Sequence, residues 1–266
     1  MLRISRETDR AGMAALYQRC FDDEPGFAER VFDRVWKPSE ALVYELDGKI
    51  VSMVLLPSFR LSENGRCGYV YALCTAPEYR GRGIMAEVLN GAHALCADRG
   101  DRFTLLVPAE GSLFSLYARF SYKPLVFVGE SVYAHAVPAK ALERARREDF
   151  AEINRLYERA FSGGDHILRD GADYETLSLL YGFGGGGFFV GDCGYVLADI
   201  TPSGAAVREA VPTGGLNELL SGACVALGVS SLELRLPASS GRPYGCVRNA
   251  GGIALKEPFF YNLMYD

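Results

Sequence analysis

Apolar residues near the start of the chain recur at helical spacing over residues 10–20 and 27–36, which predicts two helices. A short strand is predicted before them, over residues 2–5. Residues 41–46 and 50–59 are predicted strands, and Asp47-Gly48 between them is a tight hairpin signal. Another strand is predicted over residues 68–75. The pattern therefore indicates two helices followed by an antiparallel meander.

A basic glycine turn follows the meander, with the sequence Arg80-Gly-Arg-Gly-Ile-Met85. The apolar positions after it predict an amphipathic helix of about four turns that ends at Gly100. Residues 103–107 form a continuous apolar run, which predicts a strand buried on both faces. A shorter helix is predicted over residues 111–120, and strands over 125–128 and 131–137 close the unit.

The sequence pattern of this first part then repeats in a weaker form. The segment Arg6–Phe21 resembles Arg147–Phe161, and Leu16-Tyr17 aligns with Leu156-Tyr157. The order of predicted elements also repeats, with helices over 172–181 and 216–227, a hairpin over 188–200, and strands over 205–211 and 232–236. A repeat of about 140 residues indicates a duplicated domain rather than a solenoid. The predicted domains are residues 1–137 and 143–266, joined by a linker at 138–142.

The second copy lacks the basic turn. Its corresponding stretch is Pro212-Thr-Gly-Gly215, which is shorter and contains no arginine. The glycine run at residues 184–187 leads into a strand, so it is interpreted as a flexible connection. One phosphate site is therefore expected in the chain.

The composition excludes several classes of protein. The formal net charge of -5 argues against general nucleic-acid binding. Seven scattered cysteines without a CxxC pair argue against structural zinc and a disulfide framework, and they fit reduced thiols in a cytoplasmic protein. The three histidines form no metal set. No apolar run approaches the ~20 residues that span a bilayer, and the N-terminus lacks the apolar core of a signal peptide.

The turn has the chemistry of a phosphate cradle. A helix start leaves its first N–H groups unpaired and carries partial positive charge. Glycines let a ligand approach the backbone, while Arg80 and Arg82 add forked donors suited to phosphate. The alternative is an ordinary basic surface turn.

A dinucleotide-binding interpretation competes with this one. Residues 81–86 match G-x-G-x-x-A, and Asp98 and Asp101 lie near the spacing of the ribose-binding acid. In that fingerprint, however, the first glycine closely follows the strand, whereas residues 76–80 intervene here. The fingerprint also opens a β-α-β unit, whereas hairpin strands precede this turn.

The turn resembles the acetyl-CoA motif R/Q-x-x-G-x-G/A of the GNAT superfamily of N-acetyltransferases, with Met85 in place of a small residue. The segments 106–112 and 117–124 resemble the Eis-type ("enhanced intracellular survival") branch. The resemblance implies an α/β (α+β) fold of tandem GNAT domains, each a mixed, mostly antiparallel sheet flanked by helices, with the second copy degenerate. The 266 residues leave no room for the sterol-carrier domain of that branch, so its substrate preferences are not expected to transfer.

The resemblance also implies roles for individual residues. Acetyl-CoA, as cosubstrate, would pair with the end of the fourth strand and place its pyrophosphate on the turn, and Glu110 would lie near the cofactor. Tyr117 matches the tyrosine that protonates the departing CoA thiolate; the alternative is a core aromatic residue. The implied cofactor-binding residues are Leu73, Cys74, Thr75, Arg80, Gly81, Arg82, Gly83, Ile84, Met85, Ala86 and Glu110.

The residue that deprotonates the acceptor amine is left open. Glu110, the C-terminal carboxylate residue Asp266 and water are the candidates, and direct transfer needs no cysteine nucleophile at Cys74. Asp22, Asp23 and Glu24 are candidates for attracting a cation, although such acids are usually solvated.

The predicted activity is transfer of an acetyl group to a primary amine of a small molecule or peptide. The alternatives are a non-catalytic acyl-CoA-binding or sensory protein and a tandem-domain aminoacyl transferase that would need tRNA. The identity of the amine and any homo-oligomer stay open.

Overall fold

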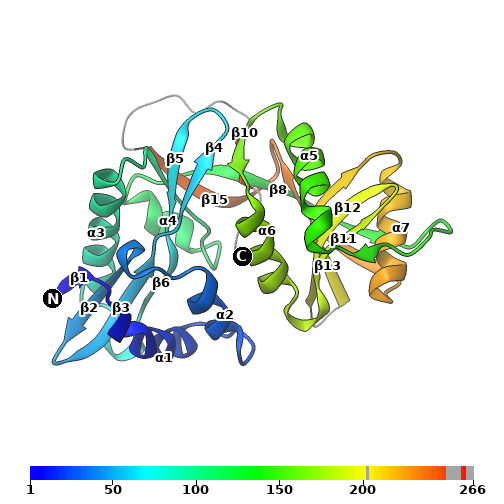
Figure 1. Cartoon of the computed structure of the whole chain (residues 1–266). Coiled ribbons are helices and arrows are strands. Elements are labelled where there is room, and N and C mark those ends of the chain that lie inside the picture. The colour runs from blue at the N-terminus through cyan, green and yellow to red at the C-terminus, as the bar shows by residue number, and fades with distance from the viewer. Residues whose placement is uncertain (202–203, 250–258, 262–266) are drawn as a thin grey trace. The chain divides into compact units, whose positions relative to one another are not determined.

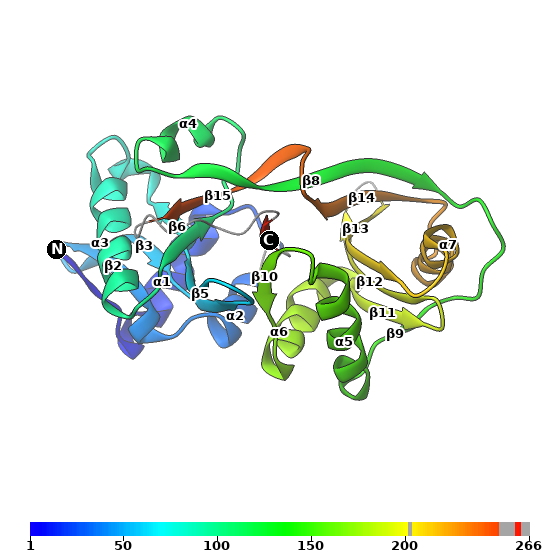
Figure 2. The same cartoon turned by 90° about the horizontal axis from the view of Figure 1, so that it is seen from above.

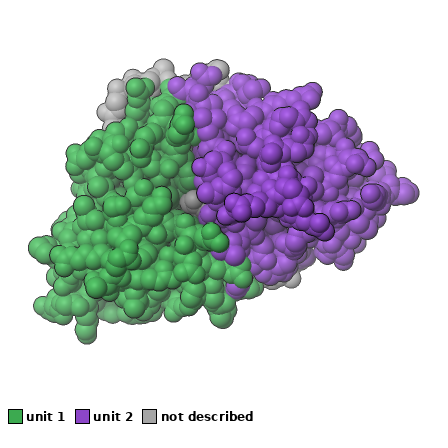
Figure 3. Space-filling model, viewed as in Figure 1, with its two compact units in different colours: residues 1–60, 64–123, 246–253 green, residues 61–63, 124–245, 254–266 purple. Residues whose placement is uncertain are grey.

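The computed structural model describes residues 1–201, 204–249 and 259–261 (Figure 1). The described chain has a mixed α/β fold in two compact units, which Figure 3 colours separately. Unit 1 contains residues 1–60, 64–123 and 246–249, and unit 2 contains residues 61–63, 124–201, 204–245 and 259–261. These units differ from the predicted domains 1–137 and 143–266, because segments from both parts of the chain are exchanged between them.

Unit 1 begins with the strand and helices that the hydrophobic pattern predicts. Its elements are β1 (Leu2–Ile4), α1 (Arg10–Cys20), α2 (Phe27–Arg34), β2 (Ala41–Leu46), β3 (Lys49–Leu55), β4 (Ser58–Leu61, its last residue in unit 2), β5 (Gly65–Tyr69), β6 (Tyr71–Thr75), α3 (Ile84–Asp98), β7 (Phe103–Leu106), α4 (Leu113–Ala118) and the last residues of β15 (Arg242–Asn249). Short 3-10 turns lie at Glu7–Asp9, Pro38–Glu40 and Pro77–Tyr79.

The first sheet of unit 1 has the strand order β1-β2-β3-β6, and its pairs are antiparallel. The predicted hairpin turn is present, with positive φ at both Asp47 (49°) and Gly48 (73°). The predicted strand over 50–59 is broken between β3 and β4, where Pro57 has no N–H to donate to a ladder.

The predicted strand over residues 68–75 is two strands, which is a correction to the sequence analysis. β5 pairs in parallel with β7, from Cys67 opposite Phe103 to Tyr69 opposite Leu105. β6 instead pairs with β3. The chain changes partner at Val70, and Ala72 just beyond it has a positive φ of 51°. The two neighbouring strands β6 and β7 therefore separate past this point, which leaves one edge of β6 without a strand in the described part of unit 1.

Helices cover both faces of this sheet. Leu42 and Val54 belong to a core cluster with Val88 and Leu89 of α3. Side chains alternate between faces along a strand, so Val43 and Met53 point to the opposite side, where α1 contacts β3 and β6. The sheet thus holds α3, and the turn before it, in a fixed position.

Unit 2 repeats much of this order. Its elements are β8 (Lys123–Ala134), β9 (Glu143–Arg144), α5 (Phe150–Phe161), β10 (Asp165–Leu168), α6 (Gly171–Tyr181), β11 (Gly187–Gly191), β12 (Gly194–Thr201), β13 (Gly204–Pro212), α7 (Leu216–Leu227), β14 (Ser231–Ala238) and β16 (Phe259–Phe260). The predicted strands at 125–128 and 131–137 form the single strand β8 (Figure 2), because it pairs without interruption with β14 from Phe127 to Ala134.

The two units share a local motif at constant spacing. In unit 1, β1 pairs with the hairpin strand β2, and Asp9 Oδ2 accepts a hydrogen bond from the Arg6 amide at 2.7 Å. In unit 2, β9 pairs with the hairpin strand β11, and Asp149 Oδ2 accepts from the Arg146 amide at 2.7 Å. The structure therefore matches Arg6 with Arg146, not with Arg147 as the sequence alignment had it.

Candidate functional site

The basic turn joins β6 to α3 in unit 1. Its two glycines adopt the left-handed backbone, with φ of 76° at Gly81 and 80° at Gly83, which other residues rarely adopt. A side chain added at either position would meet no atom within 4 Å. The left-handed backbone therefore favours glycine at both positions, and the missing side chains leave open space for a ligand. Close packing is not the reason for glycine here.

The start of α3 offers free donors to that space. The amides of Ala86 and Glu87 both donate to the Gly83 carbonyl, at 3.0 and 3.2 Å. Within the described residues, the amides of Gly83, Ile84 and Met85 have no such partner. These amides, together with the helix dipole, offer donors that suit an anion.

A cavity of about 420 Å³ lies directly at this turn. Its volume lies within the range of small-molecule sites. The turn, the end of β6 and the C-terminal end of α4 contribute its walls. The lining residues are Thr75, Tyr79, Arg80, Gly81, Gly83, Ile84, Met85, Ala86, Leu116, Arg119 and Phe120.

Most of the predicted cofactor residues meet at this cavity, but four do not line it. Leu73 and Cys74 lie earlier on β6, and Cys74 is buried. Arg82 holds its guanidinium over the Tyr79 ring at 5.1 Å and donates to the Glu78 carbonyl. Glu110 is exposed and accepts a hydrogen bond from the Ser112 hydroxyl.

Arg80 and Arg119 are the charged side chains of the lining, and both are positive. Arg80 Nε donates to the Thr75 carbonyl at 3.0 Å, which ties the turn to the end of β6. The sequence analysis missed Arg119. Its signal was the i, i+3, i+4 spacing of Leu116, Arg119 and Phe120, which places them on one face of the chain around the end of α4.

Met85, the departure from the family motif, has a packing role. It is half-buried and packs against the core cluster beneath α3, while it also lines the cavity. The position is therefore compatible with a long, flexible side chain.

Tyr117 lies on α4 beside the cavity-lining Leu116, but it does not itself line the cavity. Its ring packs edge-to-face against Tyr122, with centroids 5.9 Å apart. Burial, followed by the nearby Cys246 thiol, raises the pKa of Tyr117 above its usual value. Its phenol therefore keeps its proton at neutral pH, as a proton donor requires.

Tyr122 belongs to a buried polar chain. Its hydroxyl donates to Thr104 Oγ1 at 3.0 Å and lies 3.0 Å from His93 Nε2. Burial, followed by the charge of Arg248, lowers the pKa of His93 to about 4. This neutral imidazole, on the inner side of α3, has a structural role.

A second cavity, of about 310 Å³, lies at the loop between α1 and α2. Tyr17 donates from its hydroxyl to Asp23 Oδ2 at 2.7 Å, and the same hydroxyl is 3.5 Å from that of Tyr71. Tyr71 begins β6, where β6 and β7 separate. The lining residues are Tyr17, Gln18, Phe21, Asp23, Glu24, Pro25, Gly26 and Ala28.

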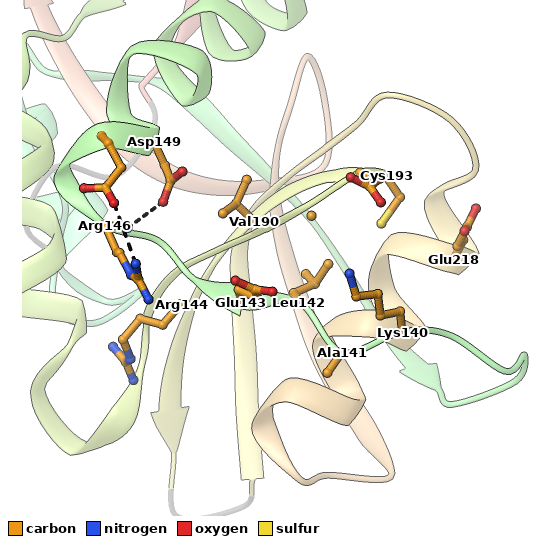
Figure 4. Close-up of a pocket in the computed structure, with 13 residues that line it drawn as sticks. Lys140, Ala141, Leu142, Glu143, Arg144, Arg146, Asp149, Val190, Cys193 and Glu218 are labelled. Carbon is orange, nitrogen blue, oxygen red and sulfur yellow. Dashed lines mark hydrogen bonds and ion pairs between the residues drawn. The ribbon is translucent and has the colours of Figure 1, made fainter.

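Unit 2 contains a different cavity, also of about 420 Å³ (Figure 4). Two of its three cationic residues, which include Lys140, are already engaged: Arg144 donates to the carbonyls of Gly185 and Gly186, and Arg146 lies 3.8 Å from Glu148. Acidic residues outnumber them in the lining, so this cavity does not suit a phosphate. The acidic lining residues are Glu143, Glu148, Asp149, Asp192 and Glu218.

All seven cysteines are free thiols. In the described ranges, no group of three or more His, Cys, Asp or Glu side chains is arranged to hold a metal ion. None of the described helices has the length and apolar character needed to cross a bilayer. Asp266 lies outside the described residues.

Comparisons with known proteins bear on the family and the fold. Residues 2–125 match the family model described as "Acetyltransferase (GNAT) domain". The chain therefore carries a GNAT acetyltransferase domain in this stretch. The comparison with curated protein sequences found no match.

Solved structures with the same fold extend over nearly the whole chain. A probable N-acyltransferase from Enterococcus faecalis is 16% identical, with a TM-score of 0.73 over 94% of this chain and 72% of that one. Eis1 from Mycobacterium abscessus is 15% identical, with a TM-score of 0.67 over 94% and 74%. A putative acetyltransferase from Pyrococcus horikoshii is 12% identical, with a TM-score of 0.60 over 100% and 95%. At these identities the likeness shows the fold.

Proposed function

We propose that this protein is an acetyl-CoA-dependent N-acetyltransferase that acts on a primary amine of a small molecule or peptide. The observation that carries the proposal is the cavity at the start of α3, where free backbone amides, two left-handed glycines and two arginines converge. The GNAT domain match over residues 2–125 covers this whole site.

Acetyl-CoA would bind along two adjoining features. Its pyrophosphate would accept hydrogen bonds from the amides of residues 83–85, with Arg80 and Arg119 adding charge. Its pantetheine arm would pair with the exposed edge of β6 at Leu73–Thr75, in the opening where β6 and β7 separate.

The acyl-transfer step then needs a neutral amine and a proton donor. The amine attacks the thioester carbonyl carbon, the carbon–sulfur bond breaks, and Tyr117 donates its proton to the departing thiolate. The cavity at the α1–α2 loop is the proposed entry side for the amine, because Asp23 and Glu24 would attract its protonated form. Glu110, Asp266 and water remain the proposed routes for the proton that the amine loses.

Unit 2 is proposed to be a degenerate copy of unit 1. Support comes from the repeated element order and from the matched Arg6–Asp9 and Arg146–Asp149 motifs. The free thiols support a reducing, cytoplasmic location.

A second candidate function is acyl-CoA binding without catalysis. One observation favours it: Tyr117 packs against the core and does not line the cavity, whereas its neighbour Leu116 does. A binding or sensory protein would keep the cradle without needing the phenol.

A matched pair of glycine substitutions tests the cradle. Gly83→Ala and Gly100→Ala both place a Cβ in open space at nearly equal φ, 80° and 83°, at opposite ends of α3. Both should lose a similar stability of about 1–2 kcal/mol. We expect only Gly83→Ala to weaken acetyl-CoA binding in calorimetry, by about tenfold or more, because its methyl group enters the cavity. Equal affinities would overturn the assignment.

Tyr117→Phe separates the two candidate functions. We expect release of free CoA thiol with a panel of amines to fall about 100-fold, in line with the loss of a general acid, while acetyl-CoA affinity is retained. Wild-type protein that binds acetyl-CoA but acetylates no amine would support the sensory protein instead.

A further inference from the structure

Two cysteines lie beside the candidate site, one at the end of α1 and one on β6 opposite Met53, on the face of the sheet that α1 contacts. Cys20 is the last residue of α1 and is half-buried, whereas Cys74 is buried on β6. The Cys20 thiol lies 3.7 Å from the Thr75 carbonyl, the same oxygen that accepts from Arg80 Nε at 3.0 Å. The end of α1, the end of β6 and the first arginine of the turn therefore converge on one carbonyl.

The surroundings shift the pKa values of the two thiols in opposite directions. The neighbouring Cys74 side chain, followed by the charges of Arg80 and then Arg19, lowers the pKa of Cys20 to about 7. The neighbouring Cys20 side chain, followed by burial, raises the pKa of Cys74. Glu78, which pairs with Arg19 at 2.9 Å, offsets part of the positive charge. One sulfur is thus a reachable thiolate and the other a sheltered thiol.

We propose that Cys20 and Cys74 form a peroxide-sensitive thiol pair, a modification site at the end of β6. The Cys20 thiolate attacks one oxygen of hydrogen peroxide, the O–O bond breaks, and a sulfenic acid and hydroxide form. The Cys74 thiol then attacks the Cys20 sulfur, its proton leaves with the hydroxyl group as water, and a disulfide remains. Overall, two thiols are oxidised and one peroxide is reduced to two waters.

Cys193 differs from Cys20 in the charges around it. Cys193 is also half-buried, but burial and the nearby carboxylates of Glu218 and Asp192 raise its pKa. It is therefore a matched control, a reachable thiol without the positive charge. At pH 7 a thiol with a pKa near 7 is about half thiolate, against roughly 3% for an ordinary cysteine.

The first experiment treats the full-length protein with equimolar hydrogen peroxide and maps its peptides by non-reducing mass spectrometry. We expect a Cys20–Cys74 disulfide, with Cys193 still reduced. Cys74→Ser should leave a sulfenic acid at Cys20 that dimedone traps, and Cys20→Ser should leave Cys74 unmodified. Peptides that remain unlinked, or a disulfide that involves Cys193 instead, would overturn the proposal.

The second experiment measures iodoacetamide labelling of each cysteine against pH. Cys20 should react at least about tenfold faster than Cys193 at pH 7, with a midpoint near pH 7. Arg80→Gln should move that midpoint upward and slow labelling at pH 7. Cys20 labelling no faster than that of Cys193 would refute the reactive thiol. Neither readout depends on acyl transfer, so failure here leaves the proposed function intact, and the reverse also holds.

Discussion

Two tyrosines at matching positions, Tyr17 on α1 and Tyr157 on α5, are both buried but have different neighbours. The Tyr17 hydroxyl donates to Asp23, and its ring lines an open cavity. The Tyr157 hydroxyl donates to the Ile167 carbonyl at 2.7 Å, and the Arg169 guanidinium covers its ring at 4.2 Å. In unit 2 an arginine therefore covers the tyrosine whose counterpart in unit 1 lines a cavity.

The connections from strand to helix differ in the same way. In unit 1, residues 76–83 connect β6 to α3, and they include two arginines and two left-handed glycines. In unit 2, residues 213–215 alone connect β13 to α7. The amide and the hydroxyl of Thr213 both donate to carbonyls of the β11–β12 turn. Gly215, before α7, has ordinary extended dihedrals.

Arginine shows most clearly what changed between the units. Arg80 and Arg119 line a cavity, where their positive charges would attract an anion. Arg169 is buried, and its charge is neutralised by Glu209 through two bonds of 3.0 Å. Two units with a similar order of elements thus differ in whether arginine lines a cavity or pairs with a carboxylate in the core.

Removal of Glu209 should have the largest effect. Glu209→Ala leaves the Arg169 charge buried, and loss of one partner of such a pair costs about 3–5 kcal/mol. The measurement is urea unfolding, with Glu152→Ala as control because its pair with Arg155 is exposed and should not change stability detectably. Acetyl-CoA affinity should be retained below the unfolding transition, and its loss would contradict the division of roles between units.

Acid should destabilise unit 1 through His93. Its folded pKa of about 4 lies below the unfolded value near 6.5, so its stabilising contribution is present above pH 6.5 and lost as pH falls towards 4. Wild type should lose about 2–3 kcal/mol over this window in excess of His93→Gln. His135→Gln, at an exposed position, is the control and should behave as wild type. Identical pH profiles for all three proteins would show that folding does not lower the pKa of His93, and they would contradict this prediction. Helix α7, the counterpart in unit 2, has no histidine.

The smallest predicted effect compares two arginines of the same site. Arg119→Ala should weaken acetyl-CoA binding about 10-fold or somewhat more, since a charged hydrogen bond contributes about 1.5–3 kcal/mol. Arg82→Ala should change affinity much less, because its guanidinium lies on Tyr79 and Glu78. Calorimetric titration of both variants decides the matter, and a greater loss at Arg82 would restore the role that the sequence gave it.

The sequence predicted features that depend on local patterns. The hairpin at Asp47-Gly48 and the start of α3 after Gly83 follow from turn and helix-start chemistry. The break at Val70 could not be predicted, because residues 68–75 are continuously apolar and a change of strand partner leaves no local mark. The strand β8 was divided at Gly129-Glu130, which reads as a turn until β14 pairs across it.

Part of the site was also beyond the sequence pattern. Arg119 reaches the turn only because α4 returns to the end of β6, a tertiary contact. The same holds for Cys20, whose chemistry comes from Cys74 and Arg80 far along the chain. Residue type and spacing thus predicted the glycine turn as a phosphate site. The positions of Arg119 and Cys20 beside this turn depend on the folded chain.

The last residues of β15 have a consequence for the order of synthesis. Cys246 to Asn249 pair with β7, opposite Leu106 to Phe103, so unit 1 is completed by a segment made more than a hundred residues later. On the ribosome, β7 would wait with one edge unpaired while unit 2 is translated, and such edges invite mispairing. Unit 1 therefore completes this sheet only after most of unit 2 has been translated.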